Sequence, residues 1–127
     1  MAQALLVNID IPLGWEVINA LDAAGLNVNV ALWAWLSEYE DWRLLLASRK
    51  LDKEDPRRRY LVVNAATDAA GIGIERAPTK MILSMTDPFI RELRHLFGKS
   101  RSVEGMRLGG QRIGNRFVHD AYVYRIA

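Results

Sequence analysis

His119 and Asp120 form the one adjacent histidine–carboxylate pair in the sequence. A carboxylate that holds an imidazole in one tautomer raises its basicity, so such a pair can serve as a general base in hydrolysis. Neighbouring residues of a strand point to opposite faces, and a contact between these two side chains therefore needs a bulge or a turn. A small hydrolase that uses His119 and Asp120 is one of the functions we consider.

Other catalytic or metal-binding patterns are missing from the sequence. It has no cysteine, which excludes a thiol nucleophile and a cysteine-ligated metal site. No serine lies in a Gly-x-Ser-x-Gly turn. Acidic residues cluster at 38–41 and at 52–55, but these clusters lie at opposite ends of a predicted strand, over about 20 Å apart. We therefore predict no metal site and no cofactor.

Basic residues are concentrated in the second half of the chain. Residues 1–56 carry four basic and nine acidic side chains, whereas residues 57–127 carry thirteen basic and six acidic ones. Basic side chains that contact phosphates, combined with exposed aromatic rings, are typical of nucleic-acid binding. The candidate nucleic-acid or phosphate-binding residues are Arg91, Arg94, Lys99, Arg101, Arg107, Arg112 and Arg116, with Tyr122 and Tyr124 as stacking positions. A solvated face that complements the acidic half explains the same residues and stays open.

Local signals predict three helices, at residues 12–24, 56–70 and 88–97. Each begins at an aspartate followed closely by a proline, and a glycine follows each predicted end. In the second helix, the residues predicted to face the core are Leu61, Val62, Ala65, Ala66 and Ala69. Arg57, Arg58 and Arg59 open that helix, where cations oppose the helix dipole, so helix stability does not explain their position.

Residues 28–36 and 42–48 have the composition of two strands joined as a hairpin. We predict a four-residue loop, Glu38 to Asp41, with Ser37 opposite Trp42. This register puts the tryptophans at 33, 35 and 42 on one face of the hairpin, as one core layer. The reverse face is apolar too, so helices, a second sheet or a partner chain should cover it. We assign the interface with a second copy to Leu32, Ala34, Leu36 and Leu45.

Further strands are predicted at 80–85, 105–108 and 121–126, with a short extra strand between Arg112 and Val118. The predicted fold is therefore a single α+β domain over residues 1–127, with three helices and a mixed sheet of about five strands in the order α-β-β-α-β-α-β-β. At 127 residues with 50% hydrophobic and 25% charged side chains, the chain has an ordinary globular composition. It shows no basic leader and no apolar run near ~18 residues, so we expect a cytoplasmic protein outside the membrane.

Three segments of the sequence resemble those of a group of short, uncharacterised bacterial proteins. They are INALDAAG (18–25), the hairpin ALWAWL (31–36) with WRLLLAS (42–48), and the terminal DAYVYRI (120–126). The resemblance covers most of the chain, rests on structural residues and implies a shared fold. It implies no catalytic residue, ligand or partner.

We expect a non-catalytic binding or assembly protein that forms a homodimer. The two-sided apolar hairpin and the opposite charges of the two halves favour self-association. Two alternatives stay open: a nucleic-acid-binding module that uses residues 91–116, and a small hydrolase that uses His119 and Asp120. Whether the protein is an enzyme is left uncertain, with absence of catalysis favoured.

Overall fold

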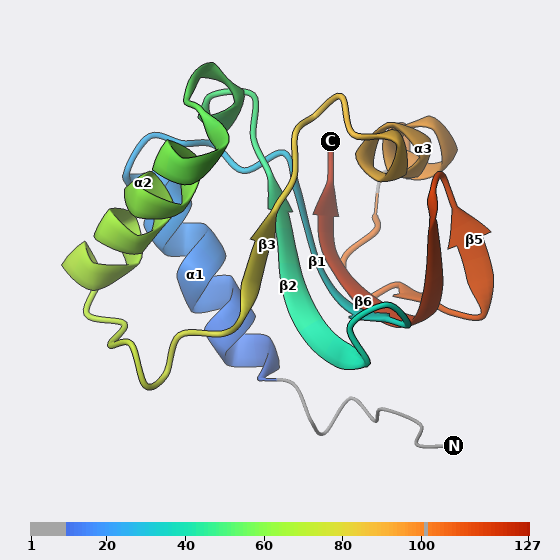
Figure 1. Ribbon diagram of the computed structural model, residues 1–127, viewed down its shortest axis with the longest axis horizontal. Helices are drawn as coiled ribbons and strands as arrows, with labels where there is room; N and C mark the ends of the chain where they lie inside the picture. The colour runs from blue at the N-terminus through green and yellow to red at the C-terminus, as the bar shows by residue number, and fades with distance from the viewer. Residues whose placement is uncertain (1–9, 101) are drawn as a thin grey trace.

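Three α-helices and a six-stranded mixed sheet make up the fold in the computed structural model, which describes residues 10–100 and 102–127 (Figure 1). The helices are α1 (Ile11–Ala23), α2 (Pro56–Ala69) and α3 (Pro88–Phe97), with a 3-10 turn, η2 (Leu51–Lys53). The strands are β1 (Val30–Leu36), β2 (Asp41–Ala47), β3 (Lys80–Ile82), β4 (Arg107–Leu108), β5 (Gln111–Ile113) and β6 (Arg116–Ile126). The predicted α+β class and element order are confirmed, with one strand more than expected.

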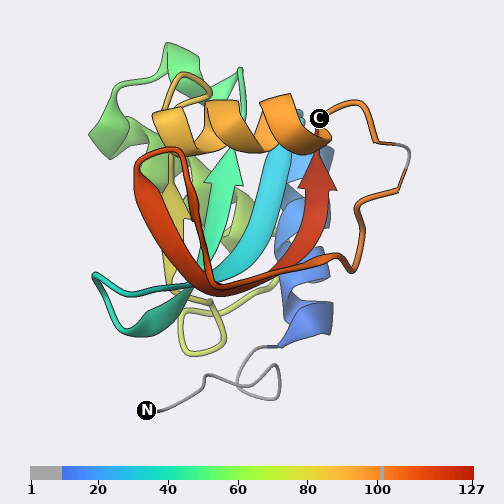
Figure 2. The same ribbon diagram turned by 90° about the vertical axis from the view of Figure 1, so that its right-hand side faces the viewer.

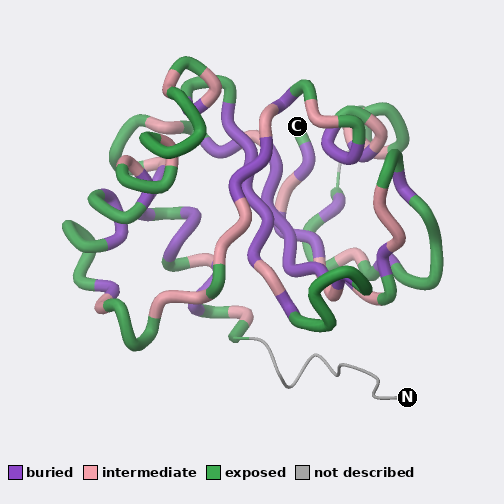
Figure 3. Tube along the Cα trace, viewed as in Figure 1, coloured by how far each residue is buried: buried purple, intermediate pink, exposed green. Residues whose placement is uncertain are grey.

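The sheet lies between two helical layers. Its strand order is β3-β2-β1-β6-β4, with β5 also paired to β6. The β2–β3 pair is parallel and the other pairs are antiparallel. Helices α1 and α2 cover one face of the sheet (Figure 1), and α3 crosses the opposite face (Figure 2). The central strands are consequently buried along most of their length (Figure 3).

The core between the sheet and the α1–α2 layer contains the tryptophans of the hairpin. Trp33 and Trp42 are buried, and half-buried Trp35 packs against the same cluster. Trp15 of α1 packs against the same core. Its ring makes an edge-to-face contact with Tyr124, with ring centroids 5.0 Å apart. The prediction that the three hairpin tryptophans form one core layer is confirmed.

The second core lies between the sheet and α3, and it contains the residues that we assigned to a dimer interface. Leu32, Ala34, Leu36 and Leu45 are each at most 1% exposed and pack with Phe89, Ile90 and Leu93 of α3. A helix of the same chain thus covers the reverse face of the hairpin. These side chains offer no surface to a second copy, which corrects the predicted interface.

The hairpin register differs from the prediction by two residues. Trp35 pairs with Trp42 and Leu36 with Asp41, so the four-residue loop is Ser37–Glu40. Glu40 takes a left-handed conformation, with φ 49°, and its N–H donates to the Leu36 carbonyl at 2.9 Å. Because a shift of two residues preserves the alternation of faces, the tryptophans remain together.

Helix α2 is rotated relative to the predicted orientation. Its buried residues are Val63, Ala66 and Thr67, whereas Leu61 is 65% exposed. Two contacts outside the helix hold this orientation: the Arg59 guanidinium donates to the carbonyls of Leu51 and Glu54, and the Tyr60 hydroxyl accepts from the Ile82 N–H at 3.0 Å. The predicted apolar face is therefore wrong at Leu61, Ala65 and Ala69, which are exposed. It is confirmed at Ala66, which is buried, and at Val62, which packs against the core.

Strand β6 is one long strand where two shorter ones were predicted. The turn at Gly114–Asn115 separates it from β5, and it continues for 11 residues. Its register against β1 shifts twice, because His119 and Tyr124 are extra residues that oppose no partner of their own. Two β-bulges of this kind increase the local twist and let a single strand curl around the end of the sheet (Figure 2).

Candidate functional site

The bulge at His119 does not bring the predicted catalytic pair together. Asp120 binds Arg107, whose Nη2 lies 2.7 Å from Oδ1 and whose Nε lies 3.2 Å from the same oxygen. The same carboxylate accepts the Ala121 N–H at 2.8 Å. The exposed His119 ring instead packs edge-on against Phe117 at 5.0 Å. Within the described residues no hydrogen bond joins His119 to Asp120, so the two side chains do not form the predicted catalytic pair.

Several of the candidate phosphate-binding residues are engaged by the chain itself. Arg94 Nε donates to the Ala127 carbonyl at 3.0 Å, and Arg107 is held by Asp120. Arg116 forms an ion pair with Glu38 at 2.5 Å. Arg91, Lys99 and Arg112 are exposed, and Arg101 lies outside the described residues. Fewer cations are thus free for phosphates than the sequence indicates.

The two candidate stacking tyrosines face the core instead of solvent. Tyr124 is 2% exposed; its hydroxyl accepts from Trp33 Nε1 at 2.9 Å and donates to the Ile11 carbonyl at 2.8 Å. Burial raises the pKa of this phenol well above its ordinary value. Half-buried Tyr122 packs edge-to-face on Tyr124, with centroids 5.3 Å apart. The prediction that these rings stack on bases is therefore corrected.

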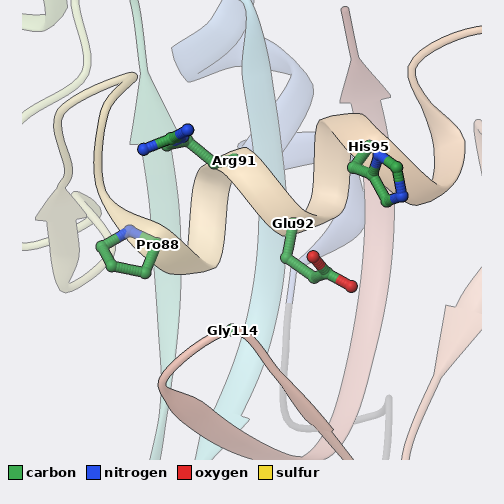
Figure 4. A pocket seen from close by; sticks show the side chains of 5 residues that line it. All are labelled: Pro88, Arg91, Glu92, His95 and Gly114. Atoms are coloured by element: carbon green, nitrogen blue, oxygen red, sulfur yellow. The ribbon is translucent and has the colours of Figure 1, made fainter.

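A shallow hollow of about 460 Å³ lies between α3 and the β5–β6 turn. Pro88, Arg91, Glu92, His95 and Gly114 line it. Figure 4 shows Arg91 and His95 toward opposite ends of the helix, with Glu92 between them pointing to the side where the turn lies. Because the titratable groups do not converge on one point, this hollow contains no acid–base constellation.

A second hollow, of about 370 Å³, lies between α2 and the segment that leads into β3. Its lining includes both apolar and polar side chains, among them a single lysine. The lining residues are Asn64, Thr67, Asp68, Ile72, Ile74, Ala77, Pro78, Thr79 and Lys80.

Lys80 is the group in this hollow whose electrostatics are perturbed. Burial lowers the pKa of its ammonium, and the negative charge of Asp68 partly offsets that effect. Its Nζ has one long hydrogen bond, 3.4 Å, to the Pro78 carbonyl. Sequence reasoning missed this residue; the available signal was a lone lysine at the start of the apolar strand Lys80–Ile82.

In the described part of the chain, no three histidine, aspartate or glutamate side chains lie close enough to share a metal ion. None of the helices in residues 10–100 and 102–127 has the length and apolar character needed to cross a membrane.

Comparison with known proteins gives no match, whether to protein-family models, to curated sequences or to solved structures. The resemblance to short bacterial proteins therefore stays an expectation. Function has to be inferred from the geometry of this chain.

Proposed function

We propose that this protein is a non-catalytic assembly protein that forms a homodimer by pairing the outward faces of two α2 helices. One observation carries the proposal. Leu61, Ala65 and Ala69 recur every four residues and form one apolar stripe, yet all three are exposed. Leu61, the largest of the three, is 65% exposed. Apolar side chains exposed in line along one helix are a candidate interaction site.

The charges along α2 are self-complementary. Arg57 and Arg58 lie at its N-terminal end. Asp68 lies in its last turn, and the exposed Glu75 lies beyond its C-terminal end. Arg58 already pairs with Glu54 at 3.0 Å, but Arg57 makes no ion pair within the described residues. When two copies of the helix pack antiparallel, the basic end of one meets the acidic end of the other. This arrangement would give a partner to Arg57, whose position helix stability does not explain.

The size of the exposed side chains favours close packing of two helices. Helices pack with axes about 8–10 Å apart, and small side chains at the contact allow the shorter distance. In a twofold dimer, the same patch is used by both copies. Ala65 stands at the centre of the stripe, so an antiparallel pair brings it next to Ala65 of the second copy, with Leu61 over Ala69 on either side.

Analytical ultracentrifugation of variants with an aspartate in place of an exposed leucine tests the proposed dimer. We expect the native chain to sediment at twice its 14.4 kDa mass at micromolar concentration, and Leu61→Asp to sediment as a monomer. Leu96 in α3 is also a partly exposed leucine, at 47%, so Leu96→Asp is the matched control and should stay dimeric. A native chain that is monomeric throughout, or a Leu61→Asp variant that remains a dimer, would refute the proposal.

A further inference from the structure

We infer that the hollow beside α2 binds a small organic carboxylate with an apolar body, anchored by the Lys80 ammonium. This ligand site lies beside the proposed dimer face. Both use α2 and share Asp68, but Leu61, Ala65 and Ala69 do not line the hollow.

The Lys80 ammonium has poor compensation inside the chain. Its single hydrogen bond to the Pro78 carbonyl is long, at 3.4 Å. Among the described residues, no carboxylate lies within 4.0 Å of Nζ, although Asp68 acts on it at longer range. A half-buried cation loses hydration and normally needs a paired anion. An anionic ligand in the hollow would supply that pairing.

The apolar lining defines the rest of the ligand. Ile72 is 2% exposed and forms part of the wall with half-buried Ala77 and Pro78, while Ile74 stands at the rim. A volume of about 370 Å³ is at the small end of the range for small-molecule sites. A short branched aliphatic chain matches both the size and the character of this wall.

Two further polar side chains can assist Lys80. The Asn64 amide and the Thr79 hydroxyl line the hollow, and neither has a side-chain hydrogen bond within the described residues. Both can donate to a carboxylate oxygen. Asp68, in contrast, repels an anion, so the carboxylate must bind on the Lys80 side of the hollow.

Titration with isovalerate, monitored by ¹H–¹⁵N NMR spectra, tests the site. We expect saturable shifts in the backbone N–H signals of residues 64–68, 72–77, 79 and 80 at concentrations up to about 10 mM. Isobutylamine, a cation of similar shape, should cause none of these shifts. Inorganic phosphate separates a general anion site from a carboxylate site: saturation by phosphate as strong as by isovalerate would contradict the apolar part of the inference.

Variants at two positions complete the test. Lys80→Met keeps the length of the side chain without the charge, and it should abolish the isovalerate shifts while the protein melts at the same temperature or higher. Asp68→Asn removes the repulsion and should tighten binding severalfold. Saturable isovalerate shifts that persist in Lys80→Met, or their absence in the native protein, would overturn the inference. Leu61→Asp should bind isovalerate as the native chain does, which separates this site from dimerisation.

Discussion

Gly14 of α1 lies directly against the phenol ring of Tyr124 in β6, so that a Cβ atom at position 14 would overlap the phenolic oxygen. Glycine is normally unfavourable within a helix, by about 1 kcal/mol relative to alanine. Here it lets α1 approach the sheet closely enough for the Tyr124 hydroxyl to reach the Ile11 carbonyl at 2.8 Å. The close approach of the helix thus depends on the absence of a side chain.

Gly14→Ala should therefore destabilise the protein despite the higher helix propensity of alanine. Overpacking of a core site costs about 1–3 kcal/mol, and we expect a loss in that range by chemical denaturation. Asn19→Ala, at an exposed position of the same helix, is the control for propensity and should be neutral or slightly stabilising. Equal behaviour of the two variants would show that Tyr124 does not constrain position 14.

Tyr124→Phe should also lower the free energy of unfolding. The change leaves the buried Trp33 Nε1–H and the Ile11 carbonyl without their partner, and an unsatisfied buried polar group costs about 1–3 kcal/mol. Tyr122→Phe is the matched control, because the Tyr122 hydroxyl makes no hydrogen bond within the described residues. Its expected loss is smaller than about 0.5 kcal/mol.

Because the Tyr124 phenol is buried, we expect the free energy of unfolding to fall in alkaline solution. Burial raises the pKa of Tyr124 in the folded chain above its ordinary value of 10.0, so the unfolded chain releases this proton first. The contribution of the protonated Tyr124 phenol to the free energy of unfolding is complete below pH 10.0. It falls as the pH rises toward the folded-state pKa. Unfolding free energy measured across this range should decline less steeply in Tyr124→Phe than in Tyr122→Phe; parallel slopes would contradict the assignment.

The β5–β6 turn packs on the start of α3 through Gly114. This residue has φ +60°, and a Cβ atom there would lie 2.5 Å from the Pro88 carbonyl oxygen. Gly110 has nearly the same backbone angle, φ +63°, but its Cβ would meet nothing within 4 Å. Gly110→Ala should cost about 1–2 kcal/mol for the left-handed backbone alone. Gly114→Ala should cost clearly more, and the difference between the variants measures the packing against α3.

Helix boundaries were predictable because their signals are local. Asp10, Asp55 and Asp87 each accept a backbone N–H from two or three residues onward, at 2.8, 3.0 and 2.9 Å. An aspartate one or two residues before a proline specifies such a cap without any information from the rest of the fold. The layer of tryptophans was predictable for a related reason, since strand alternation alone determines which residues share a face.

Features that depend on distant partners were not predictable from the sequence. The rotation of α2 depends on contacts that Arg59 and Tyr60 make with other elements, and the Arg107–Asp120 pair depends on the register of β4 against β6. The basic residues look free in the sequence because the acceptors of Arg94 and Arg116 lie far along the chain. The partial burial of Lys80 arises in the same way, from the segment folded beside α2.

The central claim is that two copies of the chain meet at α2, and a single introduced cysteine tests it most directly. The native sequence contains no cysteine, so Ala65→Cys gives one unique thiol. A disulfide forms readily when two Cα atoms come within about 4.4–6.8 Å, as two copies of position 65 would at the twofold axis. We predict that mild oxidation converts Ala65→Cys to a covalent dimer much faster than Asn19→Cys, which lies on the exposed side of α1. Equal and slow cross-linking of the two variants would contradict the claim.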